Sequence, residues 1–154
     1  MAHASTRTFV TLALIGGAIA VWSARADVDV VAAQARTPVT LTHVYTGADG
    51  VSHVEVKNVP LTPRGDADLS EMAKVSGLQF RRQAPTYVED FHPASRKQYV
   101  ITLRGEGEVE LPDGQKIIGR AGDVWLMEDV TGKGHISRGR GTADRVTLFI
   151  PVAE

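Results

Sequence analysis

Apolar and polar residues alternate along most of this chain, and the alternation predicts short β-strands. In one run, Val54 and Val56 fall on one side while His53, Glu55 and Lys57 fall on the other. A period of two is typical of a strand with one buried face. Turn residues such as Gly, Pro, Asn and Asp separate the runs. The expected strands cover residues 41–46, 51–57, 78–82, 86–91, 98–103, 108–111, 116–118, 124–127, 135–138 and 145–151.

Helical periodicity is weak everywhere except in residues 66–75. There, Asp66, Asp68 or Ser70 can cap a short helical turn, and Gly77 would end it. The turn would carry Leu69, Met72 and Ala73. The preceding residues, 60–65, are expected to form a loop. An all-β sandwich or barrel with at most one short helix is therefore the predicted fold class.

The first 26 residues are typical of a secretory signal peptide. Arg7 precedes a thirteen-residue run of apolar and small residues, and Ala24-Arg25-Ala26 matches an A-x-A cleavage site. The alternative is an uncleaved membrane anchor, but a span needs about 20 apolar residues. We expect cleavage after about Ala26, a secreted or periplasmic protein, and no stable membrane span afterwards. The predicted organisation is a signal peptide (1–26), an N-terminal tether or edge segment (27–40) and one β-barrel domain (41–154).

Charge and cysteine content limit the partners and the means of stabilisation. The formal net charge is −1, and removal of the signal peptide takes away only Arg7 and Arg25. A weakly acidic chain does not predict binding to nucleic acid or to an anionic membrane. The chain contains no cysteine, so burial of a core must stabilise the fold without disulfides.

The candidate chemistry lies between residues 90 and 135, where the strand pattern is densest. His92 and His135 stand at the two ends of this stretch. An antiparallel arrangement can bring both histidines into one barrel, and imidazole is well suited to proton transfer near neutral pH. His53 is interpreted as a solvated residue, and His43 is given the same non-functional interpretation, because no metal-ligand spacing joins the two.

The residues that follow Asp90 resemble the first signature of the cupins. That signature reads His-x-His, three or four residues, Glu, six residues, Gly. With His92 at the first histidine, Ala94 stands at the second, Gln98 at the glutamate and Gly105 at the glycine.

A second cupin-like signature follows, with Gly122 at its start and His135 at its histidine. Glu128 stands at the usual proline, and His135 comes two residues late. The combination is most similar to a group of small single-domain cupins with an RmlC-like jelly-roll barrel. The resemblance implies a double-stranded β-helix, and it implies a homodimer, since cupin barrels often pair through their edge strands.

The resemblance also implies a divalent metal, of which Mn, Fe, Ni, Cu and Zn are the candidates. Cupins commonly hold it with three His and one Glu, whereas this chain offers His92, Gln98 and His135. Ala94 cannot ligate, and an amide is a weaker ligand than a carboxylate. Asp90 is an alternative ligand, because a strand would point it to the same side as His92.

Other polar residues of the stretch are expected substrate contacts or structural groups. Arg96 is placed at the barrel mouth, Thr102 on a mixed face that lines the cavity with Gln98, and Trp125 at the substrate or in the core. The alternative for His135 is a structural role in which it pairs with Asp90 or Glu128. Arg81 or Arg82 could bind an anionic group, but adjacent strand residues face opposite ways, so at most one of them points inward. The favoured role for either is a surface ion pair, and Glu128, Asp129 and Lys133 are expected in a solvated turn.

Two functions are compatible with these residues. The first is an enzyme of lyase, isomerase or oxygenase type that uses His92 and His135, with or without metal. The alternative is a non-catalytic small-molecule binding protein with a degenerate metal site, which the residues Ala94 and Gln98 favour. Both take a small molecule as their partner, and the fold does not distinguish them.

Overall fold

The computed structural model describes residues 36–153, which form twelve β-strands and no helix. The expected signal peptide and residues 27–35 of the expected tether lie outside the described residues. No helix long and apolar enough to cross a membrane occurs within residues 36–153. The strands form three sheets.

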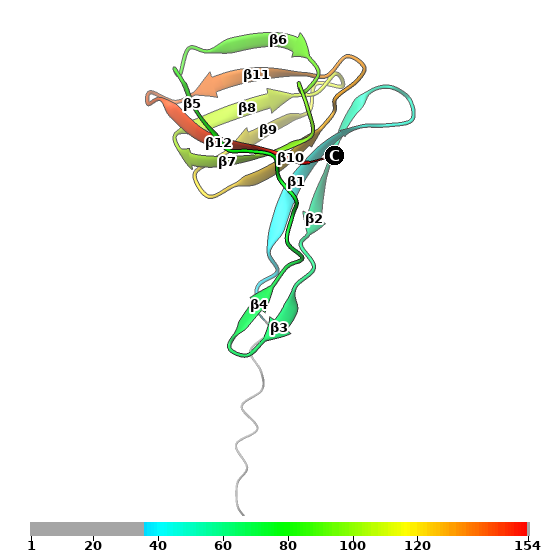
Figure 1. Cartoon of the computed structure of the whole chain (residues 1–154). Helices are drawn as coiled ribbons and strands as arrows, with labels where there is room; N and C mark the ends of the chain where they lie inside the picture. The colour runs from blue at the N-terminus through cyan, green and yellow to red at the C-terminus, as the bar shows by residue number, and fades with distance from the viewer. Residues whose placement is uncertain (1–35, 154) are drawn as a thin grey trace, which may run out of the picture. The chain divides into compact units, whose positions relative to one another are not determined.

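The first and largest sheet contains both the first and the last strand of the described chain (Figure 1). The strand of residues 145–151 comes last in the sequence but lies inside the sheet, between the strands of residues 98–104 and 79–83. The order is β2 (Ser52–Asn58), β1 (Thr40–Thr46), β10 (Val124–Glu128), β7 (Gln98–Arg104), β12 (Arg145–Pro151) and β5 (Gln79–Gln83).

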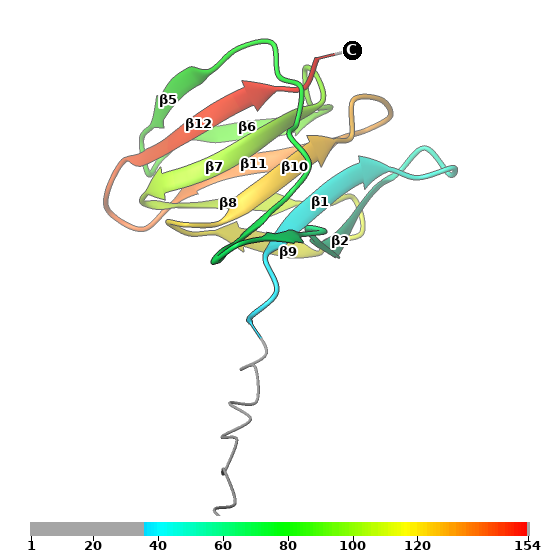
Figure 2. The ribbon, with the colours of Figure 1, turned by 60° about the horizontal axis from the view of Figure 1, so that its bottom comes forward.

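The second sheet faces the first across the interior of the domain (Figure 2). Its order is β6 (Val88–His92), β11 (His135–Arg140), β8 (Glu106–Glu110) and β9 (Lys116–Gly119). Apart from the hairpin of β8 and β9, each step along the chain from β5 to β12 passes from one sheet to the other. The eight strands thus pair as β5-β12-β7-β10 and β6-β11-β8-β9, the arrangement of a jelly-roll barrel. The expected all-β jelly-roll fold is confirmed.

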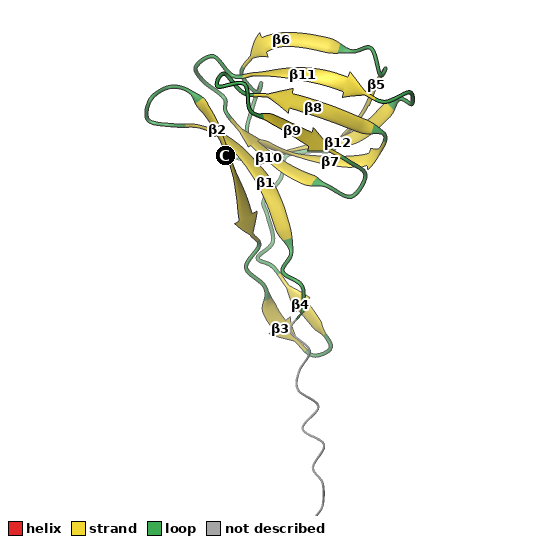
Figure 3. Ribbon diagram, turned by 180° about the vertical axis from the view of Figure 1, so that it is seen from behind, coloured by secondary structure: helices red, strands yellow, loops and turns green. Residues whose placement is uncertain are grey.

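A hairpin extends the first sheet beyond the barrel strands. β1 runs parallel to β10 and antiparallel to β2, and the turn from residue 47 to 50 is the one predicted from Gly-Ala-Asp-Gly. β2 is an edge strand of this sheet (Figure 3). Val44 of β1 is fully buried and belongs to the core, whereas Val56 of β2 is exposed. The hairpin therefore adds to the core through β1.

The structure corrects the prediction for residues 60–75. The expected loop and short helix are replaced by β3 (Thr62–Arg64) and β4 (Ala67–Leu69), which form a two-stranded sheet. Met72 is 93% exposed and Leu69 is 55% exposed. A short amphipathic helix is stabilised mainly by burial of its apolar face, and here that face has nothing to pack against.

The core fills one part of the space between the sheets. Trp125 and Met127 of β10 and Val100 of β7 point inward, as period-two alternation requires. They pack with Val109 and Leu111, which lie in and after β8. The remaining interior is a cavity.

Candidate functional site

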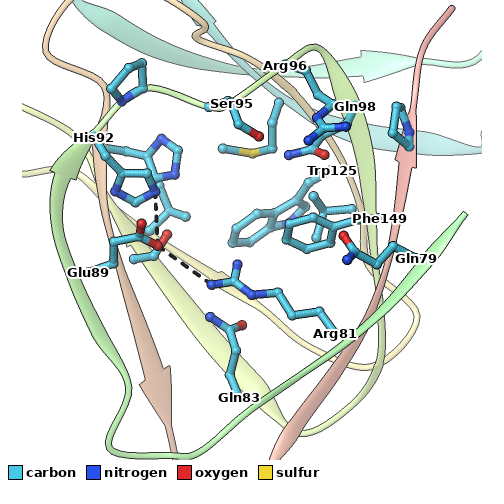
Figure 4. A pocket seen from close by; sticks show the side chains of 18 of the residues that line it. Gln79, Arg81, Gln83, Glu89, His92, Ser95, Arg96, Gln98, Trp125 and Phe149 are labelled. Atoms are coloured by element: carbon cyan, nitrogen blue, oxygen red, sulfur yellow. Dashed lines mark ion pairs between the residues drawn. The ribbon is translucent and has the colours of Figure 1, made fainter. Parts of the chain in front are cut away.

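The cavity between the sheets has a volume of about 530 Å³ and is lined by residues of both sheets. Figure 4 shows His92 and Glu89 on one side, Arg81 and Phe149 on the other, and Trp125 between them. The wall combines an apolar floor with a few convergent polar groups, as in small-molecule sites. Its polar and aromatic lining includes Arg81, Gln83, Glu89, His92, Ser95, Arg96, Gln98, Trp125, His135, Ser137, Arg145 and Phe149.

A β-bulge in β6 decides which of its side chains enter the cavity. His135 of β11 lies opposite His92, but Ser137 lies opposite Glu89. Between these two pairs, β6 has two residues, Asp90 and Phe91, where β11 has one, Ile136, and the extra residue breaks the alternation. Glu89 and His92 both line the cavity, while Asp90 is exposed. The expectation that Asp90 and His92 point the same way was therefore wrong.

His135 is held by a carboxylate that is completely buried. Its Nδ1 lies 2.6 Å from Oδ2 of Asp129, which also accepts a hydrogen bond of 3.0 Å from the hydroxyl of Ser52. A carboxylate only accepts hydrogen bonds, so the proton of the neutral imidazole is placed on Nδ1. Nε2 of His135 has no partner among the described residues and is left for the cavity that this residue lines.

The ring of His92 is oriented in a similar way by the backbone. Its Nδ1 lies 2.7 Å from the carbonyl oxygen of Asp90, to which it donates. The two imidazole rings lie side by side, with centroids 4.6 Å apart and planes at 54°. The structure therefore brings the two predicted histidines together. In each ring, Nδ1 is bonded to an acceptor of the protein, Asp129 for His135 and the carbonyl of Asp90 for His92.

A glycine allows the segment before β11 to approach β6 this closely. Gly134 has a φ of +72°, and a Cβ added to it would lie 1.9 Å from the carbonyl oxygen of His92. No side chain fits in that space, and the left-handed conformation itself favours glycine. The distance between the two histidines therefore depends on residue 134.

Glu89 connects the histidines with the opposite wall of the cavity. Its Oε2 lies 3.4 Å from Nε2 of His92 and 3.7 Å from a guanidinium nitrogen of Arg81, as Figure 4 indicates by dashed lines. It also accepts a hydrogen bond from the hydroxyl of Tyr87. That hydrogen bond is the main cause that holds the pKa of Glu89 below its usual value; burial opposes it, and His92 and Arg81 support it.

The remaining sequence-predicted site residues are divided between the cavity and its surroundings. Gln98, Arg96 and Trp125 line the cavity. Thr102 is on the expected face of β7 but is fully buried beneath the cavity wall, where it accepts a hydrogen bond of 2.8 Å from Arg145. It is therefore a support for another residue, without contact to the open space.

The donor set fits a divalent metal poorly. Within residues 36–153, no three His, Asp or Glu side chains gather closely enough to hold an ion. Gln98 offers a neutral oxygen, Ala94 none, and the side chain of Asp90 lies outside the cavity lining. Glu89 is engaged by Tyr87 and Arg81. The metal site stays a prediction from the sequence, and we derive no chemical step from it.

Four residues of the site were missed or misassigned at the sequence level. Asp129 was expected in a solvated turn, but it is 0% exposed and pairs with His135. For Arg81 a surface ion pair was favoured over the inward-facing alternative, but this residue lines the cavity. Glu89 and Arg145 were not singled out. Each is an ordinary strand or loop residue in sequence, and only the closure of the barrel brings them together.

Comparisons with known proteins add little to this description. No protein-family model and no curated protein matches the sequence. One similar solved structure is protein NMB1881 from Neisseria meningitidis, with 15% identity over 61% of this chain and 81% of that chain and a TM-score of 0.39. Another is a putative ethanolamine utilization protein from Salmonella typhimurium, with 18% identity over 77% of this chain and 100% of that chain and a TM-score of 0.40. The fold assignment rests on the strand order.

Proposed function

We propose that this chain is an exported small-molecule enzyme that transfers protons on a substrate held inside the barrel, in a reaction of lyase or isomerase type. One observation carries the proposal: a histidine at the cavity is bonded through Nδ1 to a buried carboxylate and has no protein partner at Nε2 among the described residues. A carboxylate in this position fixes the tautomer and stabilises the imidazolium that forms when Nε2 accepts a proton.

His135 is the proposed general base, since Asp129 offsets the charge that the ring gains. His92 is the proposed acid: its Nδ1 proton stays on the carbonyl of Asp90, and a second proton, held at Nε2 beside the carboxylate of Glu89, passes to another atom of the substrate. His135 then releases the proton it accepted to water, and water restores the one that His92 gave. The ring centroids are 4.6 Å apart, so both can reach one small molecule. Removal of a proton at one atom and its return at another is the minimal requirement of an isomerase or a lyase, and two adjacent imidazoles provide it.

The test is solvent-deuterium exchange, which detects proton transfer even when the product has not been identified. The purified protein is incubated in D₂O with small carbonyl compounds, both carboxylates and neutral analogues, and the carbon-bound deuterium is measured by NMR. Exchange is expected with at least one class of compound. It should fall by about 100-fold or more in His135→Asn and in His92→Ala, the usual size of a general-base contribution.

The matched control is His53→Ala. His53 forms an exposed ion pair with Asp49 and does not line the cavity. Exchange should be unchanged in this variant. The proposal would be refuted if both His135→Asn and His92→Ala exchanged deuterium at the wild-type rate. It would also be refuted if the wild-type protein exchanged deuterium into no compound of the panel.

A non-catalytic binding protein is the second candidate, and Ala94 favours it. This residue is buried at 7% exposure beside the histidines, at the position where the cupin-like signature has a metal ligand. In that case a ligand would raise the melting temperature and be recovered without deuterium and chemically unchanged.

Export, metal content and oligomeric state are proposals that rest on the sequence alone. N-terminal sequencing of the secreted or periplasmic protein tests cleavage after Ala26. Elemental analysis of wild type and His92→Ala, purified without chelator or histidine tag, tests for bound metal. Light scattering at micromolar concentration tests the homodimer, and a monomeric mass would refute it.

A further inference from the structure

A buried arginine lies in the wall of the cavity without a carboxylate partner. Arg145 is 8% exposed, and no ion pair to it exists within residues 36–153. Its Nη2 donates to Thr102, but its Nε is buried and has no hydrogen-bond partner there. Burial, and then the nearby charge of Arg81, lower the pKa of Arg145 to about 10, against a smaller opposing effect of the Asp123 carboxylate, which forms no ion pair with it. The guanidinium is therefore a cation at neutral pH.

The barrel makes room for this guanidinium with a pair of glycines. Gly107 of β8 and Gly119 of β9 lie directly opposite each other in the ladder. A Cβ at Gly107 would lie 2.5 Å from Nη1 of Arg145, and one at Gly119 would lie 3.0 Å from Nη2. The position of the cation is thus defined from both sheets, and its charge is held in place across the interior.

The charge of the cavity wall is unbalanced. Three arginines line it, Arg81, Arg96 and Arg145, against one carboxylate, Glu89. Glu89 is shared between Arg81 and His92. A buried charge without a partner is costly, and a cavity with low-dielectric walls concentrates its field on whatever enters. The unpaired cation of Arg145 and its neighbour Arg81 form what we call the arginine end of the cavity.

We propose that the arginine end binds the carboxylate of an organic acid, whose apolar body lies against Trp125 and Phe149. This deepens the proposed function, because it names the substrate class of the same cavity. Phe149 already lies beneath the guanidinium of Arg81, 5.2 Å from ring centroid to Cζ. Glu89 contacts both Arg81 and His92, so an acid held at the arginine end places its remaining atoms toward the histidines.

A carboxylate fits this end better than a phosphate does. Guanidinium groups bind carboxylates with two parallel hydrogen bonds. Phosphate sites in proteins commonly add backbone amides at a helix N-terminus or a glycine-rich nest, and the described chain has no helix. Glu89 would also repel a dianion more strongly than a monoanion.

The probes are benzoate, phenylacetate and 3-phenylpropionate, each compared with its neutral amide, and phenyl phosphate. Affinity is measured by isothermal titration and by thermal shift. At least one carboxylate is expected to bind at least tenfold more tightly than its amide, and binding should weaken with added salt.

The key variant is Arg81→Leu, and its matched control is Arg82→Leu. The two arginines are neighbours in β5, but Arg82 is 75% exposed and does not line the cavity. Arg81→Leu should lose about tenfold in carboxylate affinity, whereas Arg82→Leu should bind as wild type does. Arg145→Met should lose more; because it can impair folding, Arg81→Leu decides the test.

Several outcomes overturn the proposal. They are equal affinity for acid and amide, unchanged binding in Arg81→Leu, tighter binding of phenyl phosphate than of the carboxylates, or no binding of any probe at millimolar concentration. Titration also separates this proposal from the proposed catalysis. Carboxylate binding that depends on Arg81, without any deuterium exchange, would refute the enzyme and keep the acid site. Deuterium exchange into neutral compounds alone would refute the acid site and keep the enzyme.

Discussion

His43 and His135 are two histidines of nearly equal burial, at 5% and 4% exposure, and both contact carboxylates. In His43, Nδ1 lies 2.9 Å from Glu55 and Nε2 lies 2.9 Å from Glu128. In His135, only Nδ1 is engaged within the described chain, by Asp129. The two residues differ in the number of ring nitrogens that the protein itself uses.

The carboxylates that contact these two histidines also differ, in their exposure and in their own partners. Glu55 and Glu128 are partly exposed, and Lys57 and Lys97 neutralise them. Asp129 is completely buried, and one of its oxygens has no partner among the described residues. His43 thus belongs to a closed network of ion pairs that ties β1, β2 and β10 together. The couple of Asp129 and His135 remains open toward the cavity, and this openness distinguishes a candidate catalytic histidine from a structural one.

The largest effect is expected from Asp129→Ala. Loss of this carboxylate leaves His135 Nδ1 and the hydroxyl of Ser52 without their buried partner, which should lower the free energy of unfolding by about 3 kcal/mol. Urea denaturation followed by circular dichroism measures the change. The control is Glu55→Ala at His43, where the lost carboxylate is 44% exposed, so the destabilisation should be smaller. Equal losses in the two variants would contradict the comparison.

Gly134→Ala should come next, because the added Cβ meets the backbone of His92. Overpacking and left-handed strain together should cost about 2 to 3 kcal/mol and displace the two imidazoles. The control is Gly114→Ala, whose φ is +86° but whose Cβ would meet nothing. It should cost only about 1 kcal/mol and leave deuterium exchange intact. Thermal unfolding and the exchange assay separate the two variants.

His43→Gln should destabilise the protein by about 1 to 2 kcal/mol, because glutamine keeps one of two hydrogen bonds to the carboxylates. Deuterium exchange should not change, since His43 does not line the cavity. His135→Gln is the counterpart and should abolish exchange. A loss of exchange in His43→Gln, with the fold retained, would show that both histidines serve the chemistry.

The smallest effect concerns acid pH and the network around His43. Burial alone would raise the pKa of Glu128, but hydrogen bonds from Lys97 and His43 outweigh it and lower the pKa below 4.5. The resulting stabilisation is present above that value and is lost as the pH falls through the lower folded-state pKa. Urea midpoints of wild type and Glu128→Gln should therefore converge as the pH is lowered from about 6 toward about 3. A constant difference between them would contradict this contribution.

Much of the fold could be predicted from alternation of polarity. All ten expected strands occur, with ends shifted by a few residues at most. The periodicity succeeds because each strand has one face against the core. It failed at residues 60–75, where exposed side chains carry no information about burial, and so β3 and β4 were missed.

The candidate site was predictable only in part. The spacing of His92 and His135 placed them at one barrel, and they do lie together. The bulge in β6 was not visible in the sequence, so Asp90 was assigned to the inner face in place of Glu89. Asp129, Arg81 and Arg145 owe their roles to contacts across the closed barrel, and local sequence does not record such contacts.

The strand order of the first sheet also bears on how the chain folds. β5 pairs with β12, so Gln83 must find Arg145 before the barrel can close. Pairing of distant residues requires closure of a long loop, and the chain loses this entropy before the new contacts stabilise it. Domains rich in such pairings fold in milliseconds to seconds. β12, the last strand of the described chain, is therefore needed to join β5 to β7, and a chain cut before residue 145 would lack the strand that pairs with both.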